Sequence, residues 1–192
     1  SCIGKVAERV INNRLYWWLV GTKKQRGNRT EYQLFRLTQN THDGFQQQKH
    51  TVGFVDLAQA YDRVWRKGLL TKMEHLGIHG KMYNWIKHFL LDRTIQTKID
   101  DSISSHAVLE DGLPQGSPLS CTLFLIFIND LPDSLKTQKA LYADDLALWY
   151  SDNNIDMCQI RLNQDLKTLS EYCQQWKLKI NLYKTVYTIF TK

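Results

Sequence analysis

The sequence predicts an α+β fold in which an antiparallel sheet is covered by helices on one face. Three observations predict this class. Strand-like and helix-like segments are mixed along the 192 residues without strict alternation. Residues 119–131 are apolar on almost every side, as a central helix would be. Residues 159–176 place leucines at helical spacing along one face, which is typical of a helix that packs on a sheet.

The first half of the chain predicts helices around a short strand. Residues 3–19 carry an apolar stripe of helical period that ends at Gly21. Thr30 and Gln33 form a capping box that opens a second helix. The remaining elements of this half are a buried strand, a helical stretch, a helix closed by Gly77, and an amphipathic helix: residues 52–57, 58–65, 67–76 and 79–91.

The second half predicts strands that flank two helices. A polar turn at 100–102 joins the strands 94–99 and 104–109. The Gly- and Pro-containing loop 112–118 breaks the chain before the apolar helix. The elements that remain are two short apolar strands within 140–150, the amphipathic helix 159–176, and strand-like material over 177–191.

The charge is unevenly distributed. Residues 1–50 contain nine Lys or Arg and three Asp or Glu, whereas residues 51–192 contain sixteen of each. A basic end joined to a neutral body suggests a polyanionic partner, and a merely solvated basic loop is the alternative. The densest part supplies the candidate nucleic-acid contacts Lys23, Lys24, Arg26 and Arg29.

The cysteines and the apolar runs point to an intracellular protein, nuclear or cytoplasmic. Cys2, Cys121, Cys158 and Cys173 form no CxxC pair, so we expect reduced, structural thiols. The longest apolar run, 119–128, is too short to span a bilayer. No secretory signal is visible, and no membrane partner is expected.

Asp56 is the first residue whose position suggests chemistry. It stands at the end of an apolar strand, where the chain turns into a helix. Aspartate is a poor strand residue, and a charge beside core strands is costly unless it is paired. The alternative is that Asp56 caps the following helix.

Asp144 and Asp145 interrupt an otherwise apolar hairpin. Hairpin turns more often carry Asn-Gly or Asp-Gly, so a turn that tolerates two acids is the weaker interpretation. Together with Asp56, these acids could converge on one edge of a sheet. Oxygen ligands alone favour a hard ion, Mg²⁺ or Mn²⁺, and two such ions suit an in-line displacement at phosphorus.

The loop Gly112-Leu-Pro-Gln-Gly-Ser-Pro runs directly into the apolar helix. Its backbone and the Gln115 amide could line a groove beside the acids. An ordinary tight connection is the alternative when the loop is taken alone.

The order of these blocks resembles the palm of reverse transcriptases, specifically those of animal non-LTR retrotransposons of the jockey-like class. The blocks are Asp56-x4-Tyr61-Asp62, then Leu-Pro-Gln-Gly-Ser-Pro-Leu-Ser, then Tyr-Ala-Asp-Asp. Trp176-Lys-Leu-Lys-Ile-Asn-Leu-Tyr-Lys-Thr is similar to the motif that follows in this family, and the first helix is similar to its finger helix. The resemblance covers essentially the whole chain. It implies partial, helical, basic fingers over 1–50, a palm over 51–192, and a missing thumb.

The resemblance also implies roles for individual residues. Asp56 and Asp144 would hold two metal ions with the Leu57 carbonyl, and Asp145 would support the site. Lys184 would protonate the leaving pyrophosphate, with a solvated surface charge as the alternative. The residues implied at the nucleotide are Tyr61, as a steric gate under the sugar, Gln115 and Gly116.

The implied activity is RNA-directed DNA polymerisation, in which a dNTP is joined to a primer 3′-hydroxyl on an RNA template. The chain starts after the basic block that carries the family's triphosphate-binding arginine, for which Arg26 and Arg29 are possible substitutes. It stops before the primer grip and thumb. A catalytically inactive, nucleic-acid-binding remnant of a decayed retrotransposon is therefore the alternative, although all three acids are retained.

Overall fold

The computed structural model describes residues 2–22, 30–47, 50–52, 55–56, 60–142 and 145–190. Two compact units interleave along the chain. Unit 1 comprises Ser1–Lys24 and Tyr61–Phe127, and unit 2 comprises Gln25–Ala60 and Ile128–Lys192. The sequence suggested a division of the chain at residue 50, whereas each of these units contains residues from both sides of that position. The assignment of fingers to residues 1–50 and of palm to residues 51–192 stays a prediction.

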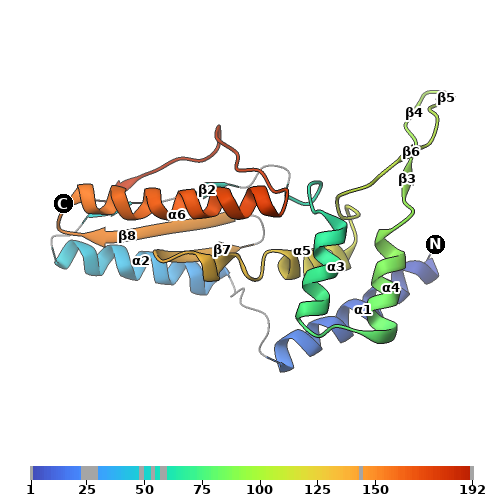
Figure 1. Ribbon diagram of the computed structural model, residues 1–192, viewed down its shortest axis with the longest axis horizontal. Helices are drawn as coiled ribbons and strands as arrows, with labels where there is room; N and C mark the ends of the chain where they lie inside the picture. The colour runs from blue at the N-terminus through green and yellow to red at the C-terminus, as the bar shows by residue number, and fades with distance from the viewer. Residues whose placement is uncertain are drawn as a thin grey trace. The chain divides into compact units, whose positions relative to one another are not determined.

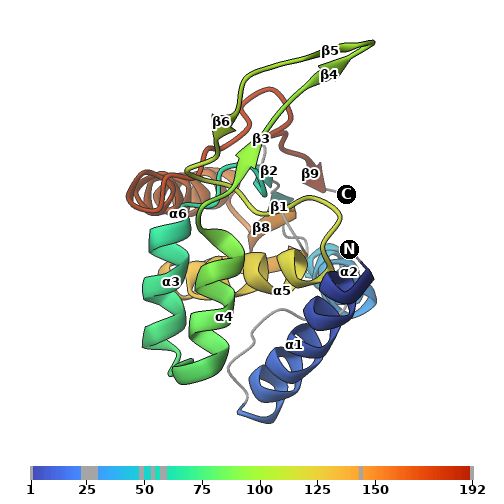
Figure 2. The ribbon, with the colours of Figure 1, turned by 90° about the vertical axis from the view of Figure 1, so that its right-hand side faces the viewer.

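Unit 1 is built around the apolar helix that the sequence predicted. This helix, α5, spans Pro118–Phe127 and buries residues on all sides. It contacts α1 and α3, and α4 packs on α3 (Figure 2). The bounds of these helices are Cys2–Gly21 for α1, Arg66–His75 for α3 and Gly80–Leu90 for α4.

Polar contacts fix α1 along α5. Leu15 and Leu19 of α1 are fully or almost fully buried. The Ser117 hydroxyl donates to Glu8 Oε2 over 2.7 Å, and the Thr122 hydroxyl donates to Asn12 Oδ1 over 2.7 Å. The two helices are thus held by one apolar contact surface and two side-chain hydrogen bonds.

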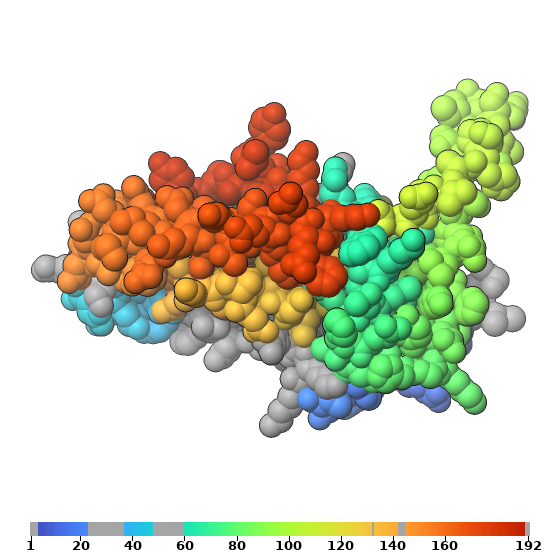
Figure 3. Space-filling view, viewed as in Figure 1, coloured from blue at the N-terminus to red at the C-terminus, as the bar shows by residue number. Residues whose placement is uncertain are grey.

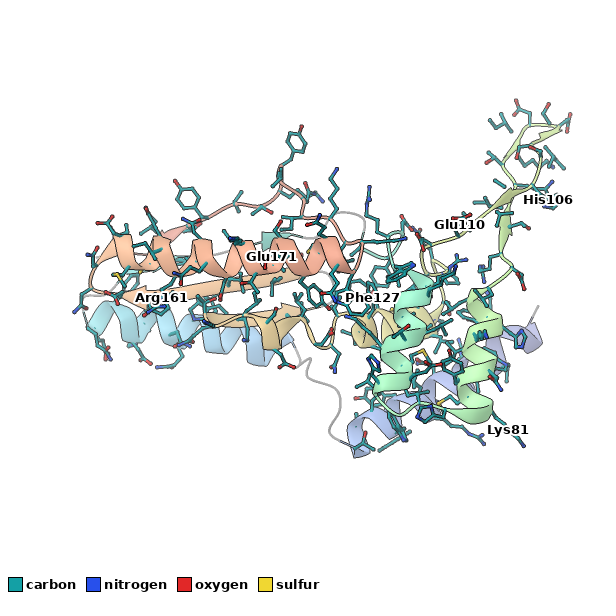
Figure 4. The ribbon with its side chains drawn as sticks, viewed as in Figure 1. Lys81, His106, Glu110, Phe127, Arg161 and Glu171 are labelled. Atoms are coloured by element: carbon teal, nitrogen blue, oxygen red, sulfur yellow. The ribbon has the colours of Figure 1, made fainter. Side chains whose placement is uncertain are left out.

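The predicted hairpin between α4 and α5 is present as two short ribbons. β3 (Thr94–Ile95) pairs with β6 (Ala107–Val108), and β4 (Lys98–Ile99) pairs with β5 (Ser102–Ile103). Asp100 turns the chain with a φ of 51°. The ribbon extends away from the helices of unit 1, and His106 lies on it (Figures 1, 3 and 4).

The sheet of unit 2 is antiparallel, with β8 at its centre. β8 (Asp145–Asp152) pairs on one side with β7 (Gln138–Tyr142) and on the other with β1 (His50–Val52) and β2 (Val55–Asp56). β9 (Ile189–Phe190) extends the sheet beyond β1. The predicted placement of the 52–56 segment beside the 140–150 hairpin is therefore confirmed.

Helices lie on both faces of this sheet, so the predicted cover on one face is wrong. α6 (Ile155–Gln175) contacts β8 and β1, and α2 (Thr30–Gln46) contacts β7, β8 and β1 from the opposite side (Figures 1 and 2). The reason lies in β8, where Leu146 and Leu148 are buried on one face and Trp149 on the other. A strand that is apolar on both faces needs cover on both.

Two hydrogen-bonded tethers hold α6. The buried carboxylate of Asp165 accepts from the Thr137 N–H at 2.6 Å and from the Lys136 N–H at 2.9 Å. The Tyr172 hydroxyl donates to Asp130 over 2.6 Å. The outer face of α6 is polar and carries Arg161 and Glu171 (Figure 4).

Three predicted elements differ from the structure. Residues 60–63, predicted as helix, form a turn. The apolar helix ends at Phe127 rather than 131, and a 3-10 turn, Leu131–Ser134, follows. Over the described residues 177–190 only Ile189–Phe190 is a strand, with a single bridge residue at Ile180, and Tyr183 and Tyr187 are exposed. Within the described ranges, no helix is long and apolar enough to cross a membrane.

Candidate active site

The acid-bearing strands of unit 2 lie next to each other. Asp56 is the last residue of β2 and Asp145 the first of β8, and the register makes them direct cross-strand partners. Tyr142 of β7 is the partner of Asp145 on the other side. Opposed residues of antiparallel strands have Cα atoms about 4.5–5.5 Å apart. The sheet therefore brings together two positions that are far apart in the sequence.

The apolar residues of β8 determine where these acids stand. Leu146 and Leu148 are buried on one face, and a slip by one residue would exchange the two faces of the strand. The pattern thus fixes Asp145 at the strand end, where its side chain is exposed. Asp144 and Leu57, the other predicted ligands, lie outside the described residues. Among the residues described, no three His, Cys, Asp or Glu side chains gather as a metal site.

The three predicted nucleotide-binding residues line one pocket of unit 1. The pocket has a volume of about 500 Å³ and is lined by Tyr61, Pro114, Gln115, Gly116, Ser117, Pro118, Ser120 and Cys121. The ring of Tyr61 is half-buried and stacks on Phe124, with centroids 4.7 Å apart and planes inclined by 22°. The predicted loop and the predicted gate residue thus share a site.

Backbone contacts hold the loop against the segment that carries Tyr61. The Gly112 N–H donates to Val64 O, and the Leu113 N–H donates to Tyr61 O, each over 2.9 Å. Gly112 has a φ of +85°, and a Cβ there would stand 2.8 Å from the Asp62 carbonyl oxygen. This glycine permits both the left-handed turn and the close approach of the two backbones.

Comparison with known proteins identifies the family of this chain. A family model described as reverse transcriptase (RNA-dependent DNA polymerase) matches residues 1–190. The chain belongs to the reverse transcriptase family. The resemblance inferred from the motifs is thereby confirmed.

Relatives of this reverse transcriptase chain come from insect mobile elements. A probable RNA-directed DNA polymerase from transposon BS of Drosophila melanogaster is 34% identical, over 100% of this chain and 23% of that protein. The RNA-directed DNA polymerase from the mobile element jockey of the same species is 32% identical, over 98% of this chain and 22% of that protein. The chain thus spans less than a quarter of these relatives.

Solved structures share the fold at low sequence identity. Telomerase from Candida albicans, in complex with a fragment of telomeric RNA, matches 93% of this chain and 33% of its own with a TM-score of 0.63 and 13% identity. Apo telomerase from Candida tropicalis, truncated from its C-terminal domain, matches 95% of this chain and 39% of its own with a TM-score of 0.54 and 14% identity. These likenesses support a polymerase fold.

The remaining predicted residues of the reverse transcriptase chain are Lys184, the basic residues of 23–29 and the cysteines. Lys184 is exposed in the turn 182–184, where its N–H and that of Tyr183 approach Asn181 Oδ1 at 3.4 and 3.2 Å. The predicted nucleic-acid contacts Lys23, Lys24, Arg26 and Arg29 lie outside the described residues. Cys121, predicted to be structural, is exposed and lines the pocket, whereas Cys158 and Cys173 are buried thiols that form no disulfide.

Sequence reasoning missed two residues that organise the pocket. Arg66 is 3% exposed, and its guanidinium donates to the carbonyl oxygens of Gly112, at 2.7 Å, and Leu109. Burial lowers the pKa of this guanidinium. Asp62 Oδ1 accepts from Gln115 Nε2 at 2.9 Å. Asp62 follows Tyr61 in the motif and could have been suspected, but no local pattern signals Arg66.

Proposed function

We propose that this chain is an RNA-directed DNA polymerase domain, which joins a dNTP to a primer 3′-hydroxyl on an RNA template. The family match over residues 1–190 supports the reaction class. The observation that carries the proposal is the register of β2 and β8, in which Asp56 and Asp145 are partners. Residues 1–50 would act as partial fingers and residues 51–192 as the palm.

The acids would hold divalent cations. Asp56, Asp144, Asp145 and the Leu57 carbonyl offer oxygen donors only, which suits Mg²⁺ or Mn²⁺. When bound, the ions supply charge that favours the deprotonated hydroxyl and stabilises the departing pyrophosphate. Asp145 is exposed at the strand end, where its carboxylate would face the phosphate chain of the nucleotide.

The pocket around Tyr61 would receive the nucleotide. Tyr61 would lie under the sugar, where its ring excludes a 2′-hydroxyl, and its stacking on Phe124 limits how far the ring can retreat. Gln115 and Gly116 would line the same space. Lys184 would give a proton to the leaving pyrophosphate, and Lys23, Lys24, Arg26 and Arg29 would contact nucleic-acid phosphates.

The test is primer extension on an RNA template with Mg²⁺ and dNTPs, using the 192-residue chain. We expect incorporation by the wild type and a loss of at least about 100-fold in Asp144→Asn, because loss of even a supporting group at a metal site costs 10–100-fold. Asp101→Asn, at an exposed acid on the ribbon of unit 1, is the matched control and should retain activity. Wild-type incorporation that equals that of Asp144→Asn would refute the proposal and favour an inactive nucleic-acid-binding chain.

A further inference from the structure

The Gln115 amide is held by a neighbour that the reverse transcription chemistry does not otherwise use. Its Nε2 donates to Asp62 Oδ1 over 2.9 Å, although the two residues are 53 positions apart. An ionised carboxylate only accepts hydrogen bonds, so the amide must turn its nitrogen toward Asp62. The carbonyl oxygen of Gln115 is then directed away from Asp62.

Backbone hydrogen bonds hold the segments that carry Gln115 and Asp62 next to each other. The hydrogen bonds from Gly112 to Val64 and from Leu113 to Tyr61 join the two segments just before Gln115. The carbonyl of Pro114, directly before Gln115, accepts from the hydroxyl of Ser120, which follows Gln115 in the chain, over 2.6 Å. The side-chain pair is thus built on backbone that several hydrogen bonds hold in place, and Gln115 lines the same pocket as Tyr61.

We propose that Asp62 is a positioning residue, which fixes the Gln115 amide so that its carbonyl oxygen is presented to the incoming nucleotide. The inference rests on the proposed function, because it assigns the pocket to a dNTP. Asp62 acts through Gln115, since its own carboxylate would repel the triphosphate. A fixed acceptor favours a nucleotide group that donates a hydrogen bond, such as a sugar hydroxyl or a base amine.

Kinetic measurements on four variants test this role. Asp62→Ala should raise the dNTP KM about 5-fold with kcat nearly unchanged, which is the usual worth of one hydrogen bond. Asp62→Asn keeps an acceptor oxygen and should restore a KM near that of the wild type. The double variant Asp62→Ala with Gln115→Ala should match Gln115→Ala alone, because Asp62 acts only through that amide.

A second measurement reports the contact without turnover. The side-chain ¹⁵N–¹H signals of Gln115, identified by their loss in Gln115→Ala, should shift in Asp62→Ala and stay near their wild-type position in Asp62→Asn. Asp101→Ala is the control, since it removes an exposed acid of the same unit. Thermal melting of every variant establishes that each is folded.

The outcomes separate the two proposals. The positioning role is refuted if the Gln115 signals do not shift in Asp62→Ala, or if the effects of the two alanine substitutions on KM are additive. The proposed polymerase function is unaffected by either outcome. A wild type that incorporates no dNTP, with Gln115 signals that still respond to Asp62→Ala, refutes the proposed function. The role of Asp62 toward a nucleotide then fails with it, and the contact is purely structural.

Discussion

At the residue scale, Gly112 couples the loop to the turn that carries Tyr61. Its φ is +85°, and an added Cβ would meet the Asp62 carbonyl oxygen at 2.8 Å. The carbonyl is part of the backbone and the Cβ is bonded directly to a backbone atom, so relieving the clash requires the backbone to shift. Gly112→Ala should therefore lower the free energy of unfolding by more than the roughly 1–2 kcal/mol that left-handed backbone alone costs. Urea unfolding followed by circular dichroism measures this.

Gly116→Ala is the matched control for that experiment. Gly116 has a similar φ of +78°, but nothing lies within 4 Å of a Cβ there. This variant should lose only the backbone term. Equal losses in the two variants would show that the added Cβ at position 112 meets no resistance from the Asp62 carbonyl.

Cys121 provides a chemical probe of the pocket at the same scale. It is exposed, whereas Cys158 and Cys173 are buried and burial raises the pKa of both thiols, that of Cys173 to about 11. Because the thiolate is the reactive form, iodoacetamide at pH 8 should modify Cys121 well before these two. Peptide mass mapping follows the modification, and a saturating dNTP should slow it at Cys121. Labelling of Cys158 or Cys173 at the rate of Cys121 would contradict the burial described here.

At the element scale, Asp165 links α6 to the start of β7. Burial alone would raise the pKa of this carboxyl, but hydrogen bonds from Thr137 and Lys136 hold it below its ordinary value. A depressed pKa in the folded state stabilises the protein above the unfolded-state pKa, near 4, and this contribution disappears as the pH falls through the folded-state value. Asp165 should therefore contribute to stability at neutral pH and not in strong acid.

Asp165→Asn tests that expectation. The neutral amide oxygen of the variant is a weaker acceptor for the Thr137 and Lys136 N–H groups, so the free energy of unfolding should fall by about 1–3 kcal/mol at pH 7. The difference from the wild type should shrink below about pH 4 as the wild-type carboxylate is protonated. Chemical unfolding at pH 7 and pH 3 measures both values. A difference that is the same at the two pH values would argue against an ionised Asp165.

Elements with local signals were predicted well, and those set by distant contacts were not. Gly77 closes α3 with a φ of +85°, as its position predicted, and Asp145 of the hairpin stands at a strand end. Residues 60–63 were predicted as part of a helix over 58–65, but they form a turn in which Tyr61 O accepts from the Leu113 N–H of a loop about 50 residues away. Arg66 likewise depends on partners 43 and 46 residues away, which no window of sequence can show.

At the scale of the whole molecule, the register sets Asp56 opposite Asp145 at one sheet edge, in a chain with a net charge of +6. The proposed site would add Asp144 to this pair. Because the sixteen acids and sixteen bases of residues 51–192 balance overall, repulsion among the three carboxylates would be local. Such an edge should be less stable without cations and more stable with them. The metal dependence of melting therefore tests the candidate site independently of turnover.

Mg²⁺ binding to the folded chain should stabilise it by mass action, by about 2.7 kcal/mol at one hundred times the dissociation constant. For a chain of this size, about 2–4 °C per kcal/mol gives an increase in Tm of about 5–11 °C.

Asp144→Asn should change Tm in opposite directions in EDTA and in Mg²⁺. It removes repulsion and should raise Tm slightly in EDTA, whereas in Mg²⁺ it loses a ligand and should melt below the wild type. Asp101→Asn, which changes the net charge equally, should follow the wild type in both. The measurement is thermal melting across a Mg²⁺ titration. Equal increases in Tm for the wild type and Asp144→Asn would exclude a cation site built on these carboxylates.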